Sequence, residues 1–158
     1  MTAAERREKI GKIRDLPDAV EAAVKGLSDQ QLDTPYREGG WSIRQVVHHL
    51  ADSHMNAFVR MKLMVTENRP TLKPYDQDAW AGLPDSSRLP VQSSLAIIRG
   101  LHERWAALLE DLPERDWTRT ALHPERGEVT MEGTLSTYAG HGANHVRQIT
   151  GLRQEKSW

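Results

Sequence analysis

The sequence predicts an all-α protein, a four-helix bundle with long connecting loops that occupies a single domain over residues 1–158. Four long segments carry apolar residues at helical spacing, whereas segments with the alternating pattern of a strand are scarce. The length of 158 residues fits one domain with one sizeable core. Together these observations favour a helical bundle over a mixed or all-β fold.

The first two helices have recognisable boundaries. The first is expected from about Ala4 to Leu27, with a kink or a restart at Pro17, because proline lacks a backbone N–H. The second follows the turn "REGG". It starts at Ser42 as the N-cap, with Gln45 three residues later in a capping-box pattern, and it ends near Glu67.

The other two helices are separated from these by loops. The third is expected from about Pro90 to Leu112 and the fourth from about Thr134 to Arg153. Between the second and third lies "RPTLKPYDQDAWAGLPDSSRLP", a long loop with four prolines. Long loops in compact domains are often functional. The stretch "HPERGEVTMEG" before the fourth helix suggests a small turn or hairpin.

Composition excludes several classes of protein. The formal net charge is −1 and the basic residues are spread along the chain, so a dedicated nucleic-acid binder is not expected. No apolar run approaches the ~20 residues of a membrane span, and the N-terminus lacks an apolar signal region, so we expect a cytoplasmic protein. With no cysteine, disulfides and a cysteine nucleophile are excluded, and any thiol chemistry needs a thiol from the substrate.

The motif "HGANH" places His141 and His145 four residues apart, on one face of the fourth helix. His145 falls near the centre of the apolar stripe and His141 at its edge, so both should face the bundle interior. Two buried histidines satisfied by hydrogen bonds are one interpretation, and by itself the commoner one. A metal-binding pair is the other. Gly140 and Gly142 would let another helix, or a ligand, approach closely.

A third ligand could come from "VVHHLADSH" in the second helix. His54 lies in the main apolar stripe, so geometry alone favours it. His49 lies on a flanking stripe that resembles the wall of a cleft, although a half-exposed polar face is an equally good interpretation. The two histidines are about 140° apart around the helix, so they cannot both bind one metal. The members of the flanking stripe are Val46, His49, Ser53, Asn56 and Arg60.

The remaining histidines and motifs are less informative. His102 and His123 are isolated in the sequence, and we interpret them as surface or loop residues. Gly142 stands where a His-Glu-x-x-His metalloprotease would carry its general base, so that class is excluded. No nucleophile elbow of the form G-x-S-x-G is present.

Three stretches carry a resemblance to a known family. "DTPYREGGWSIRQVVHHLADSHMNAFVRMKLMVTE", "RPTLKPYDQDAW" and "YAGHGANHVRQI" resemble the DinB-like superfamily, and more closely its YfiT branch, also called bacillithiol S-transferase A. The resemblance implies one divalent metal held by three histidines. In that family's pattern the first ligand lies eight residues after the tryptophan that opens the second helix. From Trp41 this position is His49, which overrules His54.

The resemblance also implies the rest of the ligand set. His141 and His145 would complete the triad, and Asn144 replaces a histidine that close relatives often carry between them. Zinc is the expected metal in the cell, and nickel is also compatible with imidazole ligands. No catalytic residue is expected beyond the metal centre, because Asp52 points away from the cleft face of His49.

The function implied is metal-dependent transfer of a small bacillithiol-like thiol to an electrophilic small molecule. A metal-dependent hydrolase of small esters or amides is the alternative, and a non-catalytic metal-binding stress-response protein is a second. Bacillithiol carries two carboxylates, so Arg60 is the leading substrate-binding candidate. Further candidates for the substrate site are Ser53 and Asn56, with Arg147 and Arg37 as weaker ones.

The expected partners are therefore a small-molecule thiol and an electrophile, with neither nucleic acid nor a membrane. We also expect a homodimer. The family resemblance implies it. In addition, Trp80 and Trp158 look like exposed aromatic residues of a single chain, and a dimer interface would bury such side chains.

Overall fold

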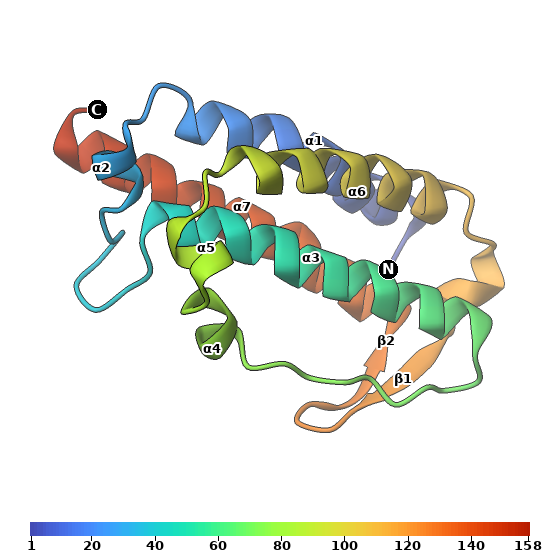
Figure 1. Ribbon diagram of the computed structural model, residues 1–158. Coiled ribbons are helices and arrows are strands. Elements are labelled where there is room, and N and C mark those ends of the chain that lie inside the picture. Colours follow the sequence, from blue (N-terminus) through green and yellow to red (C-terminus); the bar gives the residue numbers. More distant parts are fainter.

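Four long helices form a bundle in the computed structural model, which describes residues 1–158. They are α1 (Ala3–Val24), α3 (Ile43–Thr66), α6 (Gln92–Glu110) and α7 (Met131–Lys156). α1 and α3 each pack against both α6 and α7, so α1 and α3 are diagonal to one another across the bundle (Figure 1). The predicted four-helix bundle is confirmed. None of the helices combines the length and the apolar character that crossing a membrane requires.

The first two long helices lie close to their predicted positions. α1 continues through Pro17 without a break and ends at Val24, slightly before the predicted end. α3 begins at Ile43 behind the predicted capping box. The Ser42 hydroxyl accepts from the Gln45 N–H at 3.2 Å, and the Gln45 side-chain oxygen accepts from the Ser42 N–H at 2.9 Å.

α7 starts at Met131, three residues before the predicted start, because Thr130 is its N-cap and accepts from the Gly133 N–H at 3.0 Å. The proline-rich loop contains two short helices that were not predicted, α4 (Gln77–Ala81) and α5 (Pro84–Arg88). Asp76 caps α4, and Pro84 stands at the first position of α5, where its missing N–H costs nothing.

The short elements close the ends of the bundle. α2 (Asp29–Leu32) precedes α3, and the 3-10 helix η1 (Glu114–Thr118) follows α6. The predicted hairpin is confirmed as strands β1 (Thr120–His123) and β2 (Gly127–Thr130), paired antiparallel. The N–H of Leu72 donates to the Leu122 carbonyl at 2.9 Å, so the long loop is fastened to this hairpin. Figure 1 shows both lying below α3.

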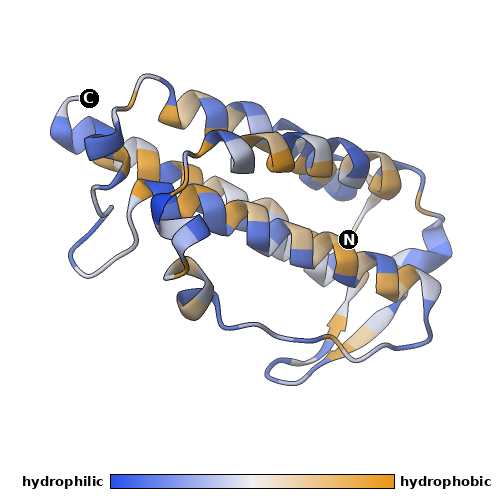
Figure 2. Ribbon diagram, viewed as in Figure 1, coloured by the Kyte–Doolittle hydropathy of each residue, from blue (hydrophilic) through white to orange (hydrophobic).

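Two apolar clusters fill the bundle, one after the other along its axis. The first takes residues of α3 from Ala57 onward, and the second takes residues up to Ala51. His54 falls between them and is fully buried. Figure 2 shows hydrophobic segments recurring along all four long helices. The core is therefore divided by a layer of polar side chains, and because they are buried each of them needs a hydrogen-bond partner.

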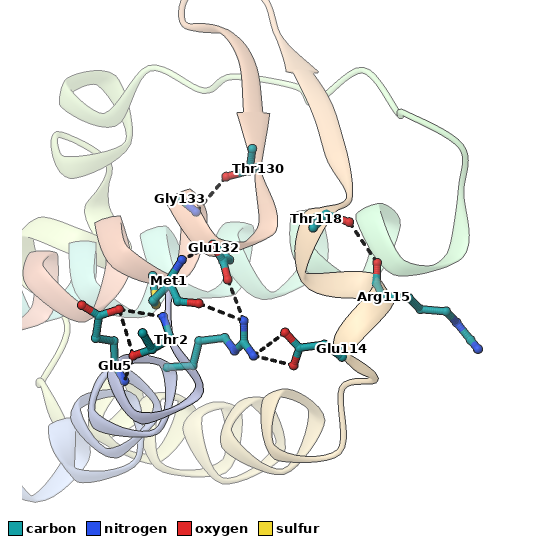
Figure 3. Close-up of polar contacts among 10 residues, drawn as sticks. Met1, Thr2, Glu5, Glu114, Arg115, Thr118, Thr130, Glu132 and Gly133 are labelled. Atoms are coloured by element: carbon teal, nitrogen blue, oxygen red, sulfur yellow. Dashed lines mark hydrogen bonds and ion pairs between the residues drawn. The ribbon is translucent and has the colours of Figure 1, made fainter.

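A buried arginine fastens the N-terminal end. Arg6 donates to a Glu132 carboxylate oxygen at 2.8 Å and to a Glu114 carboxylate oxygen at 2.6 Å. The amino group of Met1 also binds Glu132, at 3.0 Å (Figure 3). These ion pairs hold α1 against α7 and η1.

The two tryptophans proposed for an interface differ in exposure. Trp80 is 36% exposed, and its ring lies 4.5 Å from that of Tyr75. Trp158 is only partly exposed, because it packs against the second apolar cluster at the end of α7. The interpretation of Trp158 as an exposed side chain was therefore wrong.

Candidate metal centre

Three histidine nitrogens meet on one side of the bundle. His49 comes from α3, and His141 and His145 come from successive turns of α7. The Nε2 of His141 lies 3.3 Å from the Nε2 of His49 and 3.2 Å from that of His145. A tetrahedral metal with bonds of about 2.0 Å to imidazole needs its ligand nitrogens about 3.3 Å apart. No carboxylate completes the group, so a fourth position stays open to a small molecule.

Neighbouring groups contact all three rings, and for His145 and His141 they include a hydrogen-bond partner at Nδ1. The side-chain oxygen of Gln148 accepts from Nδ1 of His145 at 2.7 Å, which leaves the His145 Nε2 with a free lone pair. The Nδ1 of His141 lies 3.0 Å from the Nε2 of His54. The ring of His49 lies against Trp41, with 4.6 Å between centroids. The rings are thus held in place before any ligand is added.

All three rings are neutral at pH 7. Burial, followed by the charges of His145 and His141, lowers the pKa of His49 to about 3. Burial, followed by the charge of His145 and then Arg126, lowers the pKa of His141 to about 4. Burial also lowers the pKa of His145. Three unprotonated nitrogens directed at one point fit a soft or borderline divalent cation.

Gly142 explains the tolerance of glycine in the "HGANH" helix. A Cβ at this position would overlap the Leu16 side chain of α1, so any larger residue would force Leu16 or the helix to shift. Gly140 differs, because its Cβ would meet nothing within 4 Å. The expected close approach of another helix is therefore confirmed at Gly142, whereas no helix lies against Gly140.

Two cavities reach the histidine cluster, and both are lined in part by His141. The first, which we call the arginine cavity, has a volume of about 350 Å³ and opens between α3, α7, the hairpin and the long loop. The second, the aromatic cavity, measures about 440 Å³ and is bounded by the "REGG" turn and α4. Both are of the size that holds a small molecule. The arginine cavity is lined by Ser53, Arg60, Tyr75, His123, Arg126 and Tyr138, among others, and the aromatic cavity by Tyr36, Arg37, Trp41, His49, Asp78 and His145, among others.

Residues 12–149 match the DinB superfamily. The chain belongs to the DinB superfamily. It is 49% identical to a protein of Oceanobacillus iheyensis over 96% of this chain and 87% of that one, and 50% identical to one of Bacillus mycoides over 94% and 86%. Both relatives bear the name "putative metal-dependent hydrolase". The resemblance recognised in the sequence is thereby confirmed.

Two solved structures resemble this DinB-superfamily chain. YfiT from Bacillus subtilis matches with a TM-score of 0.98 and 42% identity, over all of this chain and 91% of that one. TT2238, a four-helix bundle protein, matches with a TM-score of 0.63 and 20% identity, over 92% of this chain and 98% of that one. The second likeness concerns the fold alone.

Only some of the candidate substrate residues line a cavity in this DinB-superfamily protein. Ser53 and Arg60 line the arginine cavity, and Arg60 donates to the Lys73 carbonyl of the long loop at 2.5 Å. Asn56 and Arg147 line neither cavity. Asn56 donates to the Asp52 carbonyl, and exposed Arg147 is hydrogen-bonded to Asn144. Asp52 also lies outside both cavities.

Several residues of the site were not predicted from the sequence. Arg126 and His123 line the arginine cavity beside Arg60, although they come from the hairpin, far away in the chain. His102 and His123 are buried, so their interpretation as surface or loop residues was wrong as to burial. Helical spacing could have identified His102, because it shares one face of α6 with Ile98, Trp105 and Leu109, all buried.

Proposed function

We propose that this protein transfers a small anionic thiol to an electrophilic small molecule, at a divalent metal held by His49, His141 and His145. The observation that carries the proposal is the convergence of three neutral histidine nitrogens at a point reached by two cavities. When bound there, a divalent ion on neutral ligands keeps its full charge and favours the thiolate form of a thiol at neutral pH.

The arginine cavity suits an acidic thiol. Arg60 and Arg126 present two guanidinium groups, and one of its two carboxylates, Asp76, already accepts the N–H groups of Asp78 and Ala79. The positive charge of Arg126 reaches the metal ligand candidate itself, since it contributes to the lowered pKa of His141. We therefore assign the carboxylates of a bacillithiol-like thiol to this cavity.

The aromatic cavity suits the electrophile. Tyr36 and Trp41 offer flat apolar surfaces, and Trp41 also contacts the ring of His49. For a chloro-aromatic acceptor, the thiolate sulfur forms a bond to the ring carbon, the carbon–chlorine bond breaks, and chloride leaves with the electron pair. The chain supplies position and exclusion of water, and no side chain has to act as the nucleophile.

The expected metal is zinc, which accepts both imidazole and thiolate ligands, and nickel is compatible with the same triad. Elemental analysis of protein purified without added metal, set beside titration of the apoprotein with each ion, identifies which one the site prefers. An ion other than zinc in the purified protein, bound more tightly than zinc in the titration, would contradict this expectation.

Two assays test the proposed reaction. Bacillithiol and a chloro-aromatic acceptor should give a thioether at a rate that depends on metal, and a panel of simple esters should stay intact. In the cobalt-substituted protein, adding the thiol should produce a sulfur-to-metal charge-transfer band. Ester hydrolysis without thioether formation or that band would move the assignment to a hydrolase.

A hydrolase is the second candidate, and one observation favours it. Asp78 of α4 lines the aromatic cavity together with all three histidines, where a carboxylate could serve as the general base for water. The names of the curated relatives point the same way. Asp78→Asn should abolish hydrolysis if this candidate is right and leave thiol transfer largely unchanged if it is wrong. Inactivity in both assays with metal bound would favour a non-catalytic metal-binding protein.

A further inference from the structure

We propose that two further histidines, His54 and His102, are positioning residues that fix the ring form of His141 by linking it to a backbone carbonyl of α1. The inference rests on His141 serving as a metal ligand in the proposed function. It concerns the apoprotein, so it can succeed or fail separately from any catalytic activity.

The chain of hydrogen bonds begins at Pro17. In an α-helix the carbonyl of residue 13 accepts from the N–H of residue 17. Proline has no N–H, so the Ile13 carbonyl lacks this partner within α1. The Nδ1 of His102, on α6, lies 2.5 Å from that oxygen and takes its place. Pro17, where a kink or a restart was predicted, therefore leaves the Ile13 carbonyl free as an acceptor in the middle of the core.

A carbonyl can only accept, and this sets the direction of every bond that follows. His102 must donate from Nδ1, so its Nε2 must accept, and it faces the Nδ1 of His54 at 2.9 Å. His54 then donates from Nδ1, and its Nε2 accepts from the Nδ1 of His141 at 3.0 Å. His141 is left with its lone pair on Nε2, the atom that faces His49 and His145.

The direction holds only while each ring is neutral, because a neutral imidazole has one donor and one acceptor. His54 and His102 are both 0% exposed, and burial of this degree disfavours the charged form. The edges of Trp105 and Tyr138 enclose His54, with 5.7 Å and 5.4 Å between ring centroids. The hydrogen bonds therefore cross the bundle from α7 through α3 and α6 to α1 between the two apolar clusters.

Packing alone does not require these histidines. Apolar side chains of similar volume would fill the same layer without having to pair any buried polar group, often at no loss of stability. With the direction reversed, His141 would carry its proton on Nε2 and could not bind a metal through that atom. What the two buried rings contribute is the choice between these forms.

The first test is the protonation of the rings in the native apoprotein. Long-range ¹⁵N–¹H correlation spectra should show His141, His54 and His102 each protonated on Nδ1 and unprotonated on Nε2. A proton on Nε2 of His141 would overturn the proposal. This measurement needs neither a variant nor bound metal.

The second test compares variants by the affinity of the apoprotein for Zn²⁺. His102→Leu removes the acceptor for His54, so His141 should populate both ring forms and bind Zn²⁺ roughly 10- to 100-fold more weakly. His102→Gln can still donate to Ile13 and accept from His54, so it should restore most of the affinity. A glutamine variant as weak as the leucine variant, with His141 in mixed ring forms, would count against the proposal.

His48 provides the matched control. It is also a buried histidine of α3, 5% exposed, and it pairs with the Ser94 hydroxyl at 2.7 Å and the Leu89 carbonyl at 3.0 Å, outside the chain of bonds to His141. His48→Leu should lower thermal stability yet leave Zn²⁺ affinity and the His141 ring form unchanged. Equal losses of affinity in His48→Leu and His102→Leu would show a general structural effect. If His102→Leu does not fold, the native ring forms and the glutamine variant decide.

Discussion

The three histidines of the triad direct their Nε2 atoms at one another, and the other four histidines do not belong to this group. Replacing His49 with alanine should remove bound metal almost completely, because two imidazoles cannot hold the ion as three do. Its neighbour His48 contacts Ser94 and Leu89 instead, so His48→Ala should keep the metal. Metal content by mass spectrometry and helicity by circular dichroism measure both. Full metal content in His49→Ala would remove it from the ligand set.

Arg60 and Arg126 should matter to one substrate and not the other. Alanine at either position removes a charge-assisted contact to a thiol carboxylate, worth about 1.5–3 kcal/mol, which is roughly a ten- to hundred-fold rise in the KM of the thiol. The KM of the electrophile should change little. Arg115, which points into solvent in Figure 3, is the control. Equal changes in both KM values would place the arginines outside the thiol site.

Single residues of the site were predictable to different degrees. His141 and His145 follow from their spacing, which any helix converts into a shared face. His49 did not follow from periodicity, since the more buried position is His54, and only the family resemblance distinguished them. Arg126 had no local signal at all, because it reaches the site through the pairing of the hairpin with distant parts of the chain.

At the scale of the helices, the two glycines of α7 should respond in opposite directions to alanine. Gly142→Ala pushes a methyl group into Leu16 and should cost about 1–3 kcal/mol of unfolding free energy. Gly140 is exposed with open space around it, so Gly140→Ala should gain up to about 1 kcal/mol from helix propensity. Chemical denaturation of the apoproteins measures both. A stabilising Gly142→Ala would mean that α1 can move away at no cost.

The extent of each element was predictable where the signal was local. The capping box at Ser42 gave the start of α3, because both of its hydrogen bonds are made within four residues. The cap of α7 was missed, since Thr130 also ends a strand and its role depends on the pairing of β1 with β2. α4 and α5 are too short for periodicity to identify, and their starts depend on single residues, Asp76 and Pro84.

For the whole molecule, a homodimer stays a prediction. Met55 and Val59, 41% and 49% exposed, lie one turn apart on the outer face of α3, where a second copy could cover them. Light scattering at micromolar concentration should give twice the chain mass of 17.9 kDa. Val59→Glu should favour the monomer. A monomer in the unmodified protein would refute the prediction.

The burial of the triad within the fold determines how pH should act on stability. The pKa values of His49 and His141, about 3 and about 4, are lowered from the ordinary value of 6.5. Above pH 6.5 neither the folded nor the unfolded chain protonates these rings, so their contribution is constant. As pH falls below 6.5 the unfolded chain gains protons that the folded chain cannot, and stability falls by about 1.4 kcal/mol per pH unit for each ring.

The same burial leads to a prediction for metal binding that opposes ordinary expectation. Histidines with ordinary pKa values would lose about tenfold in metal affinity per ligand for each pH unit below 6.5, because protons compete for the nitrogens. Here His49 and His141, with pKa values of about 3 and about 4, are still neutral at pH 5.5, so these two ligands should add almost no loss of Zn²⁺ affinity between pH 7 and pH 5.5. Over that range the melting temperature should fall in both forms, while the increment due to metal persists. A steep loss of affinity over this range, measured by competition with a chelator of known pH dependence, would mean that the triad is open to protons and water.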